Sequence, residues 1–218
     1  MKYKYVLFDL DGTVSQSAEG VRASLAHALR QLGATPPDLN NYSLYMGPPL
    51  IDTFRHLCGL DEAEAARGAT LYRDYYERFG KHMNKAYDGI PELLAALRGD
   101  GVKTAVCTSK YESFAGEILD ILQLREMFDA VCGSNIDGSR KDKKDLIPYA
   151  IRSLGGAFPR DAANAVMLGD TRFDAKGARL CGVDFIGVTY GYGSADAMRE
   201  QGATVFADSP RALLTLLR

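Results

Sequence analysis

The chain has 218 residues, of which 46% are hydrophobic and 25% are charged, and its formal net charge is −2. This composition is typical of a globular protein, and a near-neutral charge gives no reason to expect a nucleic acid or a membrane surface as partner. The apolar runs have the length of strands and are too short to span a bilayer, and the first of them follows directly on the N-terminus, so no secretory signal is expected.

The first part of the chain predicts one strand followed by helices. Residues 5–8, Tyr-Val-Leu-Phe, are an apolar run of the kind found in buried strands. Apolar residues then recur at helical spacing in three segments, which predict helices at about residues 17–32, 51–57 and 61–79. Because residues 15–85 contain no convincing strand, we expect a helical insert there.

After residue 87, predicted strands alternate with predicted helices. The strands are residues 102–107, 130–132, 165–168, 185–188 and 204–206. The helices are residues 92–98, 111–122, 142–154, 174–181, 195–201 and a last helix from Pro210. This alternation implies βαβ units and a parallel sheet. We therefore expect an α/β fold, with a Rossmann-like parallel sheet and helices on both faces, formed by residues 1–14 and 88–218.

The four cysteines show no spacing of a metal site. They are Cys58, Cys107, Cys132 and Cys181, and three of them fall in or beside apolar segments. Buried free thiols are typical of proteins in a reducing compartment. The cytoplasm is therefore the expected location.

Polar side chains follow the predicted strands at the positions where an open parallel sheet binds its ligands, beyond the carboxyl ends of the strands. They are Asp9 and Asp11, then Thr108, Ser109 and Lys110, then a polar loop leading to Lys141, Lys143 and Lys144, and finally Asp170 and Asp174. Clustered carboxylates repel one another, and a divalent cation relieves that repulsion. Since hard oxygen ligands suit magnesium, the pattern predicts a Mg²⁺ site.

Each of these pieces alone has a structural explanation. An aspartate after a strand often forms a turn or caps the next helix. Thr108-Ser109 alone is more often an N-cap than a phosphate site, and the lysines alone would usually be a solvated face. The four pieces together, each at a strand end and in this order, are hard to explain as caps, so we favour a functional site.

The same residues resemble the haloacid dehalogenase-like (HAD) hydrolase superfamily. Four parts of the chain resemble its four motifs: Phe8-Asp9-Leu10-Asp11-Gly12-Thr13-Val14, Val106-Cys107-Thr108-Ser109, the lysine near 143 and Gly169-Asp170-Thr171-Arg172-Phe173-Asp174. Four further segments resemble the phosphoglycolate phosphatase-like branch of this superfamily: Gly47-Pro48-Pro49-Leu50, Tyr87-x-Gly89-Ile90-Pro91, Asp137-Gly138-Ser139-Arg140 and Gly191-Tyr192-Gly193-Ser194. The resemblance covers the whole chain and implies that residues 15–87 form a helical-bundle cap domain.

The resemblance implies a role for each site residue. Asp9 would be the nucleophile that forms an aspartyl-phosphate, and Asp11 would be the general acid and then the base. Lys143 would neutralise the phosphate, and Lys141 and Lys144 are the alternatives for this role. The expected metal ligands or their partners are Asp9, Asp11 (through its backbone carbonyl), Asp170 and Asp174. The expected substrate-binding residues are Thr108, Ser109, Lys143, Gly47 and Arg55.

The resemblance thus implies a magnesium-dependent phosphomonoesterase, phosphoglycolate phosphatase-like or nucleotidase-like, that acts on a small phosphorylated metabolite. Asp11 argues against a dehalogenase, because that class has no leaving alkoxide to protonate. Two alternatives stay open: a sugar phosphomutase similar to β-phosphoglucomutase, and a non-catalytic binding protein on the same fold. Neither the substrate nor the choice between monomer and homodimer follows from the sequence.

Overall fold

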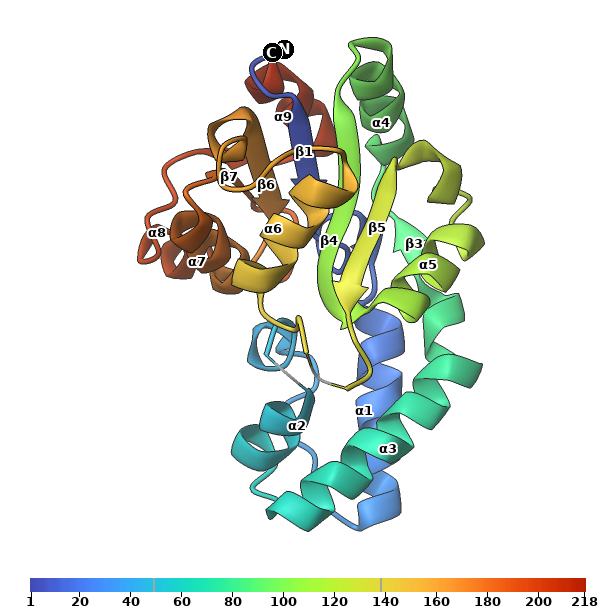
Figure 1. The fold of residues 1–218 in the computed structure, drawn as a ribbon. Helices are drawn as coiled ribbons and strands as arrows, with labels where there is room; N and C mark the ends of the chain where they lie inside the picture. Colours follow the sequence, from blue (N-terminus) through green and yellow to red (C-terminus); the bar gives the residue numbers. More distant parts are fainter. Residues whose placement is uncertain (49, 138) are drawn as a thin grey trace. The chain divides into compact units, whose positions relative to one another are not determined.

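The fold is shown in Figure 1 as a computed structural model, which describes residues 1–48, 50–137 and 139–218. The chain divides into a first unit, Met1–Gln16 with Ala86–Arg218, and a second unit, Ser17–Lys85. The boundaries expected from the sequence, after residue 14 and before residue 88, each lie two residues from the observed ones. Pro49 and Gly138, which belong to two of the motifs quoted above, lie outside the described residues.

The first unit is built around a six-stranded sheet in which every neighbouring pair is parallel. Its strands are Tyr5–Phe8 (β1), Lys103–Tyr111 (β4), Ala130–Ser134 (β5), Ala165–Gly169 (β6), Asp184–Val188 (β7) and Phe206–Ala207 (β8). The order is β5-β4-β1-β6-β7-β8, so β1 lies between β4 and β6. The chain first builds outward from β1 to β4 and β5, and then returns to build on the other side. Such a reversal places the ligand site at the carboxyl ends of β1 and its neighbours.

Helices cover both faces of this sheet (Figure 1). They are Ile90–Gly99 (α4), Glu112–Ile121 (α5), Lys143–Ser153 (α6), Arg172–Cys181 (α7), Ala195–Arg199 (α8) and Pro210–Leu217 (α9). Tyr5 and Leu7 of β1 belong to the apolar cluster that also contains Leu146, Ile147, Ala150 and Ile151 of α6. Val6 and Phe8 point to the opposite face and are also fully buried. The expected α/β fold, with helices on both faces of a parallel sheet, is confirmed.

The second unit is helical. Its helices are Ala18–Leu32 (α1), Leu50–Asp52 (α2) and Glu62–Arg78 (α3), with a π-helical segment at Thr53–Leu57 and 3₁₀ turns at Tyr42–Leu44 and Gly80–Met83. α1 and α3 pack through buried side chains such as Leu25 and Ala69. Among the helices of the described residues, none combines the length and apolarity that a membrane span requires.

Two short strands mark the points where the chain leaves and re-enters the first unit, Ser15–Gln16 (β2) and Lys85–Ala86 (β3). The expectation of no strand between residues 15 and 85 is therefore wrong, because two-residue strands are too short to show a periodic pattern. The exit and re-entry points lie side by side: the Gln16 side chain donates to the carbonyl of Ala86 at 3.2 Å, and the Tyr87 N–H donates to that of Val14 at 3.1 Å.

β4 is longer than its sequence predicts. The apolar run predicts an end at Cys107, but the strand continues to Tyr111, so Thr108, Ser109 and Lys110 lie within it. The register with β5 shifts after Cys107, and pairing resumes where Tyr111 lies opposite Ser134. The polar end of this strand carries no apolar run, which is why the sequence indicated a loop.

α6 and α7 approach each other closely because α7 carries a glycine where they meet. A Cβ atom placed on Gly177 would lie 2.3 Å from the Cβ of Lys143, the first residue of α6. A contact of that length is a severe clash, so any side chain at position 177 would push the two helices apart. Gly177 therefore fixes where α6 begins relative to α7.

Gly177→Ala should lower the free energy of unfolding by about 1–3 kcal/mol, because the clash outweighs the better helix propensity of alanine. Gly99→Ala is the matched control: Gly99 is also helical, and nothing lies within 4 Å of the position of its Cβ. The control should leave stability unchanged or raise it by up to about 1 kcal/mol. Urea denaturation measures both. Equal stability of the two variants would contradict the close helix contact.

Candidate active site

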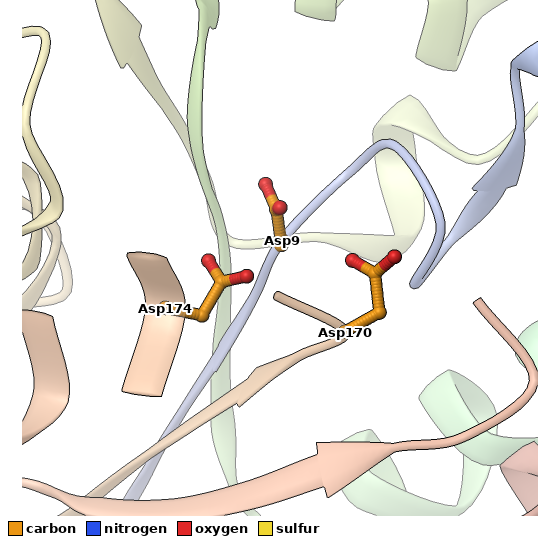
Figure 2. Close-up of side chains that lie close together, drawn as sticks. All are labelled: Asp9, Asp170 and Asp174. Carbon is orange, nitrogen blue, oxygen red and sulfur yellow. The ribbon is translucent and has the colours of Figure 1, made fainter. Parts of the chain in front are cut away.

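Three aspartates meet at the carboxyl ends of β1 and β6. Asp9 directly follows β1, Asp170 directly follows β6, and Asp174 lies in the first turn of α7. Figure 2 shows the three side chains close together with their carboxylates directed to the same side, and one oxygen from each lies within 4.8 Å of the other two. All three residues are buried, with Asp170 and Asp174 fully so. The structure thus brings together three of the four acids that the sequence singled out.

Lys143 supplies a positive charge to this cluster. Its Nζ lies 2.8 Å from Oδ1 of Asp9 and 2.7 Å from Oδ1 of Asp174, and it donates a hydrogen bond to the carbonyl of Cys107 at 2.7 Å. Lys143 is buried, whereas Lys141 and Lys144 are exposed. Of the three lysines that the sequence left open, Lys143 is therefore the one that faces the acids.

Each carboxylate of the cluster is held by further donors. Asp174 caps α7: its Oδ2 accepts from the Thr171 N–H at 3.1 Å and from the Thr171 hydroxyl at 2.6 Å. Asp170 accepts from the Tyr192 N–H at 2.8 Å and from the Thr13 hydroxyl at 3.5 Å. Asp174 is thus a capping residue, as one of the two explanations predicts, but its other oxygen, Oδ1, forms the ion pair with Lys143.

The electrostatics of the cluster are unbalanced. Burial, together with the charge of Asp174, raises the pKa of Asp9 to about 7 against the opposing effect of Lys143. Burial, together with the charges of Asp174 and Asp9, raises the pKa of Asp170 well above its ordinary value. Burial alone would lower the pKa of Lys143, but Asp174 and Asp9 together hold it above its usual value.

Three ionised carboxylates and one ammonium group would leave two uncompensated negative charges in a buried site. Buried like charges are strongly unfavourable, which is why the two carboxyl pKa values are raised. A divalent cation would balance that charge, and carboxylate oxygens are the donors that Mg²⁺ prefers. The donor set therefore fits a hard divalent cation.

Asp11 is oriented differently from the other acids. Its Oδ2 lies 3.0 Å from Nζ of Lys110, and its Oδ1 is buried with no hydrogen-bond partner among the described residues. Its side chain does not belong to the three-acid cluster. Sequence reasoning placed Lys110 after a strand but gave it no role, and the structure pairs it with Asp11.

The remaining predicted site residues lie in two places. Thr108 is buried near the end of β4, and its hydroxyl oxygen accepts from the Lys110 N–H at 3.2 Å, while Ser109 beside it is exposed. Gly47 and Arg55 are exposed residues of the second unit, and their part in substrate binding stays a prediction. Thr13, Thr171 and Tyr192, which hold the acids, were not identified as such from the sequence.

Comparisons with known proteins agree with this geometry. A family model described as haloacid dehalogenase-like hydrolase matches residues 6–188. A 5′-nucleotidase of Pseudomonas aeruginosa is 40% identical, over 100% of this chain and 96% of its own. The tyrosine-protein kinase PtkA of Mycobacterium tuberculosis is 40% identical over 92% of this chain and 67% of its own. A phosphoglycolate phosphatase of Caulobacter vibrioides is 30% identical over 97% of this chain and 91% of its own.

A solved structure extends the likeness to three dimensions. The crystal structure of a predicted phosphatase from Clostridium acetobutylicum matches with a TM-score of 0.91 at 38% identity, covering 100% of this chain and 99% of that one. The family model spans most of the sheet and all four motif positions. The chain therefore belongs to the haloacid dehalogenase-like hydrolases, and within them to the phosphatases of the phosphoglycolate phosphatase-like branch.

Proposed function

We propose that this phosphatase is a magnesium-dependent phosphomonoesterase that hydrolyses a small phosphorylated metabolite through an aspartyl-phosphate on Asp9. The observation that carries the proposal is the buried ion pair of Lys143 with Asp9, set beside Asp170 and Asp174 at the ends of neighbouring strands. A nucleophile, a fixed positive charge and donors for a cation are the groups that phosphoryl transfer requires.

The contacts of Asp9 select its attacking atom. Oδ1 accepts from the Leu10 N–H at 2.8 Å and lies 2.8 Å from the Lys143 ammonium group. We therefore assign the attack on phosphorus to Oδ2. Lys143 would keep Asp9 ionised and would neutralise the phosphoryl oxygens as charge moves onto the leaving group. The Thr108 hydroxyl, buried at the neighbouring strand end, would hydrogen-bond a phosphoryl oxygen.

Asp11 would carry the protons. Its carboxylate is partly exposed and does not belong to the cluster of three acids, so water can reach it. It would protonate the leaving oxygen and then accept the proton of the water that hydrolyses the aspartyl-phosphate. This role requires an oxygen leaving group, which agrees with a phosphate ester as substrate.

Asp9, Asp170 and Asp174 provide the oxygens that would hold or orient a magnesium ion. When bound, Mg²⁺ supplies charge neutralisation for the transferring phosphoryl group. Lys143 and Thr171 hold Asp174 on opposite oxygens, so this carboxylate is fixed before any cation binds. Such preorganisation lowers the cost of reorganisation during the reaction.

The second unit would act as a cap that excludes water and selects the substrate, with Gly47 and Arg55 as contact residues. The names of the relatives support a nucleoside monophosphate or a small phosphorylated acid as substrate.

We further propose a cytoplasmic location, in agreement with four free cysteines, and a monomer or homodimer that binds neither nucleic acid nor a membrane.

Asp9→Asn should reduce kcat for p-nitrophenyl phosphate by more than about 10³-fold, because an amide cannot act as the nucleophile. Release of p-nitrophenol with and without MgCl₂ measures the effect. Asp196→Asn is the control, since the Asp196 side chain is 87% exposed and pairs with Arg199 in the same helix. Full activity of Asp9→Asn would refute the mechanism, and an inactive wild type would favour the non-catalytic binding protein.

Asp170→Asn should stabilise the metal-free protein by more than about 1 kcal/mol, because it removes a buried carboxyl with a raised pKa. Such a carboxyl stays protonated in the folded chain while the unfolded chain releases the proton. Rising pH therefore destabilises the wild type relative to the variant, from about pH 4 upward. Thermal unfolding from pH 5 to 8 tests this.

The same variant should lose the stabilisation that MgCl₂ gives to the wild type, since one donor is gone. Asp184→Asn serves as the control, because the Asp184 side chain is 58% exposed and lies at the other end of β7 from the site. A variant that is less stable without metal, or that still responds fully to MgCl₂, would contradict the proposed cation site.

A panel of 5′-nucleotides, phosphoglycolate and sugar phosphates should show net release of inorganic phosphate from at least one member. A sugar phosphomutase would instead interconvert glucose 1-phosphate and glucose 6-phosphate with little net release. Transfer from labelled ATP to protein tyrosine is a third arm, because PtkA is among the relatives. Isomer exchange or tyrosine labelling without phosphate release would replace the hydrolase assignment.

A further inference from the structure

The loop after β7 reaches back to the acid cluster. The Tyr192 N–H donates to Oδ2 of Asp170 at 2.8 Å. A Cβ atom on Gly191 would lie 2.4 Å from the Cβ of Asp170 and 2.5 Å from the carbonyl oxygen of Gly12. The loop Tyr190–Gly193 can thus lie against both Asp170 and the turn that follows β1 because position 191 has no side chain.

A tyrosine hydroxyl joins this loop to that turn. Tyr190 donates to the carbonyl of Thr13 at 2.9 Å. The hydroxyl of Thr13 donates in turn to Oδ1 of Asp170 at 3.5 Å, and Thr13 is fully buried. The two oxygens of Asp170 therefore receive donors from two separate segments, and the Tyr190 hydroxyl connects those segments.

The chemical state of Tyr190 suits this role. Burial raises the pKa of its hydroxyl, so the group stays protonated and donates at any physiological pH. Its ring packs edge-on against Tyr87, with the ring centroids 4.7 Å apart. Replacing Tyr190 by phenylalanine would retain that ring contact and remove only the hydrogen bond. The mechanism proposed above does not use Tyr190.

We propose that Tyr190 is a positioning residue whose hydroxyl holds the Tyr190–Gly193 loop against the turn after β1, and so fixes the carboxylate of Asp170 for a divalent cation. The inference rests on the proposed cation site. Groups that orient metal ligands typically change metal affinity by about 10–100-fold when removed. The hydroxyl of Tyr190 should therefore influence cation binding although it would not touch the ion.

The test compares Tyr190→Phe with Tyr3→Phe. Tyr3 is also buried, and its hydroxyl donates to Oδ2 of Asp184 at 2.6 Å, at the opposite end of β7 from the loop. Each variant loses the hydrogen bond that its tyrosine hydroxyl donates, but only the bond of Tyr190 is near Asp170. The measurement is the MgCl₂ concentration that gives half of the maximal rise in the thermal unfolding midpoint, with the metal-free midpoint recorded for each protein.

Tyr190→Phe should require about 10-fold more MgCl₂ than the wild type, and Tyr3→Phe less than about 2-fold more. At saturating MgCl₂, phosphate release by Tyr190→Phe should return to within about 2-fold of the wild type, because affinity rather than chemistry is altered. An unchanged MgCl₂ requirement of Tyr190→Phe, or an equal shift in Tyr3→Phe, would overturn the inference. A wild type that does not respond to MgCl₂ would instead overturn the cation site itself.

Discussion

The contact of one buried ammonium group with two buried carboxylates organises the first unit. Lys143 begins α6, while its partners are Asp9 after β1, Asp174 in α7 and the Cys107 carbonyl in β4. Burying any of these charges alone would be strongly unfavourable, so each group requires the others to be in place. The close approach of α6 to α7 at Gly177 and the parallel alignment of β1 with β4 are the packing features that bring them within reach.

The same arrangement leaves the site short of positive charge. A site built only for stability would balance its carboxylates, whereas here the excess of buried carboxylates raises the pKa of Asp9 to about 7 and raises the pKa of Asp170 well above its usual value. Functional sites commonly retain such unfavourable electrostatics because the bound ion or substrate relieves them. Stability, cation binding and the charge of the phosphoryl group are therefore linked through one cluster of side chains.

Much of this could be predicted from the sequence, because the features that carry it are local. Asp9 and Asp170 each follow an apolar run directly, so the strand pattern and the motif identify the same positions. The motif favours Lys143 but leaves Lys141 and Lys144 open, since the choice depends on the residue at which α6 begins. The polar end of β4 could not be predicted as a strand, because strand pairing, rather than apolar content, extends it to Tyr111. The hydrogen bond from Tyr190 to Thr13 joins residues 177 positions apart, and nothing local in the sequence indicates it.

The chain leaves the first unit at Gln16 and re-enters it at Ala86, and these two residues lie side by side. The fold of the first unit therefore does not depend on the length of the segment inserted between them. Contacts within the first unit, such as the hydrogen bond from the Tyr87 N–H to the Val14 carbonyl, hold the two ends of the insert together. Loop-closure entropy changes only slowly with the length of an insert, so segments of very different size could be carried between the same two points. Asp9, Lys143, Asp170 and Asp174 all lie outside the inserted segment, which leaves evolution free to remodel the insert, and with it substrate choice, without rebuilding the groups that perform the chemistry.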